Sequence, residues 1–245
     1  SELTGCNIYG KAEYYNTGES VKDRAALFII QDALQKKRIK KGGTIVEGTA
    51  GNTGIGLAVV CKEYDLKLKI VIPNTQSIEK KETLKKLGAE LVEVDAVPFS
   101  NPKNYIKQSK KIAEDLNRKD NKGVYWANQF DNIANTEAHI QTTSKEIWNQ
   151  PAGSIDGFTC AVGTGGTLAG VSIGLKEKNK DIKIALSDPM GSSLYSYIKE
   201  NKLESSGSSM TEGIGTGRIT KNFEKALVDD AFQTDDYEAM QIVFD

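Results

Sequence analysis

Hydrophobic and polar positions follow two alternating rhythms along most of the chain. Short apolar runs typical of β-strands stand at residues 8–13, 44–47, 68–73, 91–94, 123–127, 157–162 and 182–187. Between them, apolar residues recur at helical spacing over 20–37, 53–64, 79–87, 104–116, 133–148 and 168–178. Strands separated by single helices indicate βαβ units and a parallel sheet. The pattern therefore predicts an α/β fold with its chemistry in the loops that follow the strands.

Composition narrows the classes of function. The 245 residues include 32 basic and 33 acidic ones, so the near-zero net charge provides no basic surface for nucleic acid or an acidic membrane. No apolar stretch approaches the roughly 20 residues of a membrane span, and the N-terminus shows no signal-peptide pattern. We expect a small-molecule ligand.

The thiols and the imidazole offer little further chemistry. Cys6, Cys61 and Cys160 lie far apart and without CxxC spacing, so we expect buried thiols in a reducing compartment. With one histidine, His139, a zinc site or a histidine-based triad is hard to build. We therefore expect no metal.

Lys22 is the most informative single residue. Ser20 and Asp23 have the spacing of a helix N-cap and its capping-box partner, which places Lys22 in the first helical turn. The positive end of a helix disfavours an ammonium and should lower the pKa of this amine. A neutral amine is a nucleophile suited to a Schiff base. The alternative is an ordinary solvated lysine.

A second candidate site is the turn Gly163-Thr164-Gly165-Gly166-Thr167, between a strand and a helix. Backbone N–H groups at a helix N-terminus bind phosphate. The turn lacks the lysine of a nucleotide P-loop and the spacing of GxGxxG, so it favours a monophosphate. A tight turn without a ligand is the alternative.

Two further glycine-rich segments complete the picture. Residues 48–56 again follow a strand, and their N–H groups with Asn52 could hold a carboxylate or a ring hydroxyl, although a turn is an equal alternative. Residues 211–217 follow no clear strand, and a surface loop is the simpler interpretation. An amine beside a phosphate site is what pyridoxal phosphate requires.

These motifs resemble the cysteine synthase and cystathionine β-synthase family of pyridoxal-phosphate enzymes, and most closely its fungal cysteine-synthase-like members, some of them mitochondrial. The matching segments are 20–24, 49–54, 163–167 and 213–215. The resemblance implies the tryptophan synthase β-subunit-like architecture of fold type II, with two doubly wound α/β domains. Residues 16–125 would form a smaller mobile domain, and residues 1–15 plus 126–245 a larger one.

The resemblance also implies roles for individual residues. Lys22 would form the Schiff base and then move the α-proton, and Asn52 would bond the ring hydroxyl. Gly213 would line the edge of the cofactor. The phosphate would be held by Gly163, Thr164, Gly165, Gly166 and Thr167, and the substrate carboxylate would be bound by Thr49, Ala50, Gly51, Asn52, Thr53 and Gln129.

The implied reaction is a β-replacement that makes L-cysteine from O-acetyl-L-serine, or another O-activated serine, and sulfide through an aminoacrylate. A homodimer is implied, in the mitochondrion or alternatively the cytoplasm. Cystathionine synthesis is a further alternative, because 187–192 and 211–215 bear some likeness to enzymes that use serine and homocysteine. Cysteine desulfhydrase activity is another, and a catalytically impaired regulatory or scaffold homologue is an alternative of a different class.

The chain departs from the family pattern in three places. Ala50 stands where many cysteine synthases have serine, and Glu19 stands close to Lys22, where it would favour the charged amine. The family's serine that contacts the pyridine nitrogen comes from a glycine- and serine-rich segment, and none precedes Asp245. We expect both ends to be trimmed and the larger domain to be incomplete at its C-terminus.

Overall fold

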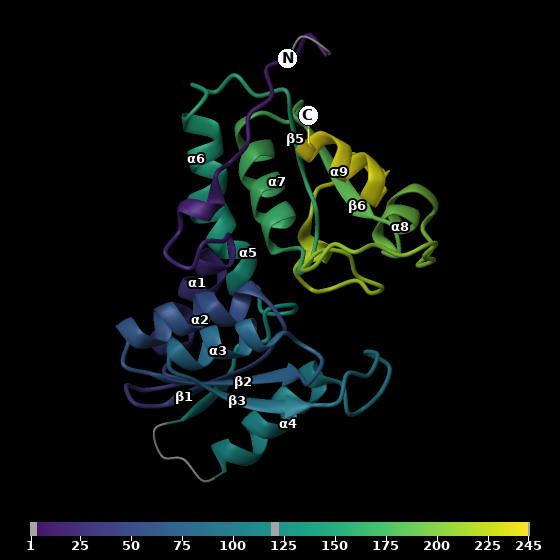
Figure 1. The fold of residues 1–245 in the computed structure, drawn as a ribbon. Coiled ribbons are helices and arrows are strands. Elements are labelled where there is room, and N and C mark those ends of the chain that lie inside the picture. Colours follow the sequence, from purple (N-terminus) through teal and green to yellow (C-terminus); the bar gives the residue numbers. More distant parts are fainter. Residues whose placement is uncertain (1–3, 119–122, 245) are drawn as a thin grey trace.

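A computed structural model describes residues 4–118 and 123–244. The first three residues and the last residue of the predicted larger domain therefore lie outside the described residues. The described chain contains two parallel sheets, of four and of three strands (Figure 1). This α/β architecture is the predicted one.

The four-stranded sheet has the order β3-β2-β1-β4 and is parallel throughout. Helices α1 to α3 cover one face and α4 covers the other (Figure 1). Both faces of β1 are thus buried, as expected for a central strand of a parallel sheet. The strands are β1 (Thr44–Gly48), β2 (Lys67–Pro73), β3 (Ala89–Val94) and β4 (Val124–Trp126), and the helices are α1 (Lys22–Gln35), α2 (Asn52–Glu63), α3 (Ile78–Lys86) and α4 (Tyr105–Asn117).

The three-stranded sheet has the order β5-β6-β7, again parallel. Its own apolar core includes Leu168, Val171 and Leu175 of α7, which are buried in one cluster with residues of β6. The elements of this half are β5 (Gly157–Cys160), α7 (Gly166–Lys178), β6 (Lys183–Pro189), α8 (Leu194–Glu200), a 3₁₀ turn (Phe223–Lys225), β7 (Asp230–Thr234) and α9 (Asp236–Phe244).

One long helical run joins the two halves. It consists of α5 (Ala134–Ala138), a π-helical segment (His139–Thr143) and α6 (Ser144–Asn149), where the sequence predicted one uninterrupted helix. Within it, the hydroxyl of Thr142 donates to the carbonyl of Ala138 (2.6 Å), and that of Ser144 to the carbonyl of Ile140 (2.8 Å). Such bonds to the i−4 carbonyl compete with the regular ladder and disturb a helix locally.

Two parts of the sequence prediction were wrong or incomplete. Residues 8–13 form no strand, because among the described residues none pairs with them, and Ile8 and Tyr9 are exposed. They lead instead into a 3₁₀ turn, Glu13–Tyr15. Strand β7 escaped prediction because its polar sequence lacks the apolar alternation by which strands are recognised.

Candidate active site

Lys22 is the first residue of α1, as the sequence predicted, but the cap differs. Ser20 stands two residues before the helix, where its hydroxyl accepts the N–H of Lys22 (3.3 Å). Asp23 does not close a capping box, because its carboxylate accepts the N–H of Gly18 across the preceding turn. Helix α2 lies so close that a Cβ on Gly56 would come within 3.1 Å of the Lys22 carbonyl carbon.

The amine of Lys22 has an unusual setting. Burial lowers its pKa, and the Cys160 thiol and the Glu13 carboxylate partly oppose this. The predicted direction is therefore right, with burial as its main cause, and Glu13 takes the part expected of Glu19. Because Cys160 is the last residue of β5, the amine lies near the end of that strand. Within the described part of the chain, no hydrogen bond or ion pair engages Lys22 Nζ.

An ion-pair network fixes the start of α1. Arg24 donates to both carboxylate oxygens of Glu13 (2.8 and 2.9 Å) and to both of Glu146 on α6 (2.7 and 2.8 Å). Lys11 also pairs with Glu146 (2.7 Å). These bidentate contacts attach the N-terminal segment to α1 and α6.

The turn at 163–167 connects β5 to α7. Gly165 has a φ of +88° at the N-cap of α7, a conformation that glycine adopts without strain. A Cβ on Gly163 would lie 2.3 Å from the carbonyl oxygen of Gly213, so the two predicted motifs meet at backbone contact. The N–H groups of the first turn of α7 have no partner inside the helix. N–H groups in this position can bind an anion, so the turn at 163–167 stays the candidate phosphate site.

His139 holds the last residue of this turn. Its Nε2 lies 3.2 Å from Thr167 Oγ1, and its Nδ1 lies 2.9 Å from Thr143 Oγ1. Burial, together with the charges of Lys22 and Arg24, lowers the pKa of His139 to about 3. The imidazole is thus neutral and carries a single N–H. If that N–H donates to Thr167, the threonine hydroxyl is left to donate into the anion site.

Buried amides join the turn at 163–167, here called the phosphate turn after its proposed role, to Gln129. Asn135 Nδ2 donates to the Gln129 carbonyl (2.9 Å) and to Thr164 Oγ1 (3.0 Å). Asn222 Nδ2 donates to the same carbonyl (2.9 Å), and Thr220 Oγ1 donates to the Thr164 carbonyl (2.7 Å). These bonds fix the position of Gln129 relative to the anion site.

The loop between β1 and α2, with the first residues of α2, contains the residues predicted to bind the substrate carboxylate and the ring hydroxyl. Asn52 begins α2 with an exposed side chain that makes no hydrogen bond among the described residues. It stands four residues before Gly56, so both lie on the helix face that meets α1. Thr49 Oγ1 accepts the N–H of Gly51 (3.1 Å), and a Cβ on Gly51 would meet only open space. Ala50, between them, is half-buried.

Gln129 lies against this loop. Its Oε1 accepts a hydrogen bond from Thr53 Oγ1 (2.5 Å), and its Nε2 donates to Glu47 Oε1 (3.2 Å). Burial raises the pKa of Glu47 to about 8, and the opposing effects come from the Gln129 side chain and the backbone N–H groups of Asn128 and Gln129. The structure thus brings Lys22, the phosphate turn, the loop at 49–53, Gln129 and Gly213 to one region.

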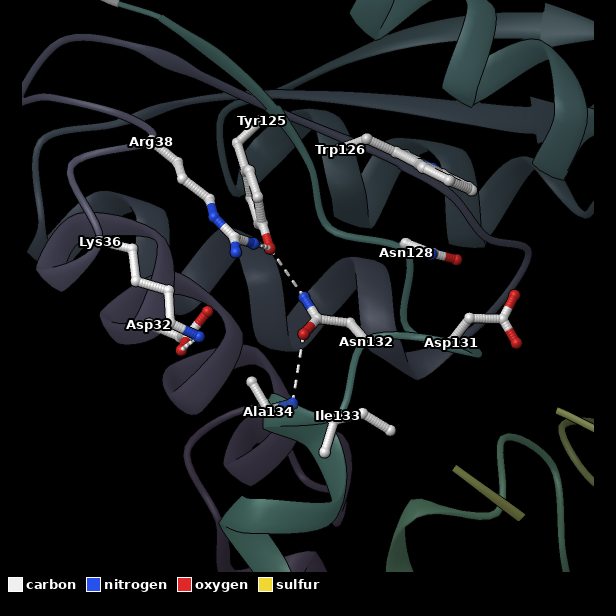
Figure 2. A pocket seen from close by; sticks show the side chains of 10 residues that line it. All are labelled: Asp32, Lys36, Arg38, Tyr125, Trp126, Asn128, Asp131, Asn132, Ile133 and Ala134. Carbon is white, nitrogen blue, oxygen red and sulfur yellow. Dashed lines mark hydrogen bonds and ion pairs between the residues drawn. The ribbon is translucent and has the colours of Figure 1, made fainter. Parts of the chain in front are cut away.

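Lys22 does not line either of two surface hollows. The larger, of about 400 Å³, lies between the end of α1 and the segment after β4, where Asn132 Nδ2 donates to the Tyr125 hydroxyl (3.0 Å) (Figure 2). None of the predicted site residues lines it. The other, of about 360 Å³, lies between 189–192 and 207–217.

Among the described residues, no group of three His, Cys, Asp or Glu side chains is placed to hold a metal ion. No helix of the described residues is both long and apolar enough to cross a membrane.

Comparison with known proteins decides the family. The family described as "Pyridoxal-phosphate dependent enzyme" matches residues 1–243. The chain belongs to this family. Cysteine synthase 1 of Neurospora crassa is 53% identical to the chain over 249 residues, and that of Emericella nidulans is 51% identical. The matches include the whole of this chain but only 65% and 66% of the length of those two proteins.

A solved structure shows the same fold. The O-acetylserine dependent cystathionine beta-synthase from Helicobacter pylori is 34% identical and superposes with a TM-score of 0.81, over 96% of this chain and 72% of its own. This pyridoxal-phosphate fold therefore extends over nearly the whole chain, as the resemblance implied.

The described residues fit pyridoxal phosphate. Among residues 4–118 and 123–244, no ion pair engages the amine of Lys22 and no hydrogen bond engages the amide of Asn52. The amine lies near the strand that leads to the candidate anion site. A Cβ on Gly213 would meet open space, so room remains at the predicted cofactor edge. Lys22 would hold the cofactor covalently, 163–167 its phosphate, and Asn52 its ring hydroxyl.

Sequence reasoning missed the residues that support the site: Glu47, Asn135, His139, Thr220 and Asn222. His139 was considered only as a metal ligand or triad member, and its place on a predicted helix gave no signal. The thiols also differ from expectation, because Cys6 is exposed and Cys160 is half-buried, whereas Cys61 is buried.

Proposed function

We propose that the protein is a pyridoxal-phosphate-dependent cysteine synthase, which forms L-cysteine and acetate from O-acetyl-L-serine and sulfide. The observation that carries this proposal is the amine of Lys22, which has no ion pair in the described part of the chain and lies near the strand end that leads into the candidate anion site at 163–167. The sequence identity to the fungal cysteine synthases supports the choice of reaction.

In the proposed mechanism, the chain supplies binding, orientation and a proton carrier. When bound, the cofactor supplies an electron sink for the electrons left at the substrate's α-carbon. Lys22 Nζ removes the α-proton and later returns one. Its burial lowers the pKa and so favours the neutral amine that a base requires at neutral pH. The loop at 49–53 and Gln129 bind the substrate carboxylate.

The domain division is part of the proposal: residues 16–125 move as a smaller domain against the rest. The location of nearly all of the four-stranded sheet within this range supports it. Two contacts join the proposed smaller domain to the rest of the chain, one on either side of the segment 213–217. Lys80 on α3 pairs with Glu212, and the Arg218 guanidinium lies 4.7 Å from the ring centre of Phe99. Closure around substrate would exclude water.

Cystathionine synthesis is a second candidate, favoured by the structural match to the Helicobacter pylori enzyme. The deciding experiment, on the full-length protein, compares O-acetylserine plus sulfide with homocysteine supplied together with either O-acetylserine or serine. Faster formation of cysteine supports the proposal, and faster formation of cystathionine overturns it.

A homodimer is proposed by resemblance alone. A cysteine synthase of Saccharomyces cerevisiae that is 36% identical carries "mitochondrial" in its name, which supports a mitochondrial location.

The role of Lys22 is tested by substitution. Lys22→Ala should abolish the visible absorbance of covalently held cofactor. It should also lower the turnover rate about 10²- to 10⁴-fold, as expected for loss of a general acid–base group. Lys41→Ala, at a lysine side chain that is 79% exposed, is the matched control and should change neither. A wild-type protein that stays colourless with added cofactor would exclude the enzyme and favour a regulatory homologue.

A further inference from the structure

Glu47 is a buried acid that the proposed mechanism does not use. It lies in β1, the strand between β2 and β4, and is fully buried. No cation pairs with it among the described residues, and its Oε2 has no hydrogen-bond partner there. A carboxyl group in such a position is costly, so a purpose beyond packing is expected.

The contacts of Glu47 lead to one side chain. Its Oε1 accepts a hydrogen bond from Gln129 Nε2 (3.2 Å), and the backbone N–H groups of Asn128 and Gln129 also favour its charged form. At the other end of the same amide, Gln129 Oε1 accepts from Thr53 Oγ1 (2.5 Å). An amide has one oxygen and two N–H groups, so one N–H of Gln129 stays available.

Of these two neighbours, Glu47 alone can distinguish the ends of the amide. The hydroxyl of Thr53 can donate to an oxygen or accept from an N–H, so it tolerates either orientation of Gln129. Burial raises the pKa of Glu47 to about 8, and above that pH its ionised carboxylate only accepts. Turning the amide over would set the Gln129 oxygen against Glu47 Oε1, two acceptors facing each other. The backbone N–H groups of Asn128 and Gln129 favour the charged form of Glu47, which can only accept.

We infer that Glu47 is a positioning residue that fixes the amide orientation of Gln129, so that an N–H and not the carbonyl oxygen faces the substrate carboxylate. The inference rests on the proposed function, in which Gln129 binds that carboxylate. It explains why an acid is placed in a central strand directly before the substrate loop.

The test is a double-mutant cycle on the cofactor-loaded, full-length protein. The probe is L-alanine, which has an α-carboxylate and no β-leaving group, and its binding is followed by the visible absorbance of the bound cofactor. Binding is measured at about pH 9, above the pKa of Glu47, where the wild type has an ionised carboxylate. Glu47→Gln keeps the shape but can present an N–H to Gln129, so the dissociation constant should rise roughly tenfold to hundredfold. In a Gln129→Ala background, the same substitution should change it less than about twofold.

Asp188→Asn is the matched control. Asp188 is also a fully buried acid with one oxygen that has no partner among the described residues, but it lies in β6. This variant should bind L-alanine as the wild type does. An equal loss from Glu47→Gln in both backgrounds, or no loss in either, would overturn the inference.

Two outcomes separate this inference from the proposed function. If the wild type makes no cysteine but binds L-alanine in the Glu47-dependent way, the proposed function fails and the inference stands. If Glu47→Gln does not fold, Glu47→Asp keeps the acid and shortens its reach by one methylene group. It should weaken binding in the wild-type background only, and an equal effect in both backgrounds would again refute the inference.

Discussion

Lowering the pH should destabilise this protein through one imidazole. His139 is fully buried, and its pKa is lowered to about 3 by burial first, then by the charges of Lys22 and Arg24. In the unfolded chain the same group has an ordinary pKa near 6.5. Between these two values the unfolded state binds a proton that the folded state does not. Stability is therefore lost as the pH falls below about 6.5.

The size of this loss depends on how far the pH falls below the pKa of the unfolded chain. That pKa is about 6.5, so pH 5 lies about 1.5 pH units below it, and each unit lowers the free energy of unfolding by about 1.4 kcal/mol. His139 should therefore remove about 2 kcal/mol from the free energy of unfolding at pH 5. The result does not depend on the folded pKa, provided that it lies below about 4.

The assay is urea unfolding of the cofactor-free protein at pH 7 and pH 5. Bound phosphate near Thr167 would oppose the shift, so the cofactor is removed first. His139→Gln is the control, because every other titrating group is common to both proteins. The wild type should lose about 2 kcal/mol more than the variant between the two pH values.

A second measurement checks the cause directly. The sequence contains a single histidine, so one imidazole proton resonance reports on it without ambiguity. That resonance should not titrate above pH 5 in the folded protein. Equal losses in the wild type and in His139→Gln, or a titration midpoint above pH 6, would show that burial of His139 does not lower its pKa.

Two further substitutions test packing and charge. Gly166→Ala would set a Cβ 2.1 Å from Asn135 Oδ1, so it should cost about 1–3 kcal/mol of stability and weaken phosphate binding. Gly10→Ala, which meets open space, should cost little by the same urea assay, and equal costs would contradict the packing argument. Arg24→Gln should cost about 1–2 kcal/mol by breaking a bidentate, largely buried network. Lys36→Gln breaks an exposed i,i+4 pair and should cost less than about 0.5 kcal/mol, so a similar melting temperature for both variants would refute this ranking.

The strand–helix rhythm could be predicted from the sequence because it depends on residues near one another in the chain. Most predicted elements agree with the structure to within a few residues. The exception at 8–13 shows the limit: an apolar run becomes a strand only if a partner strand is beside it. Strand β7 shows the converse, since its polar residues form a strand by pairing with β6.

Part of the candidate site could also be predicted from the sequence. The glycine-rich turn at 163–167 and the lysine at the start of α1 are local features, in which residue type and spacing already indicate the chemistry. Their convergence followed from a general rule, that loops at the carboxyl ends of parallel strands share one edge of a sheet.

The supporting residues could be found only from the tertiary structure. Glu47 and Gln129 are 82 positions apart, and Asn135 and Thr164 are 29 positions apart, so no local pattern relates them. A buried acid, a neutral histidine and a bonded amide acquire their properties from the neighbours that folding supplies. By itself, the sequence determined the α/β rhythm and indicated Lys22 and the turn at 163–167 as candidate site residues, because these depend on short-range spacing. Which polar side chains orient them was decided by the fold, because hydrogen bonds and burial depend on proximity in space.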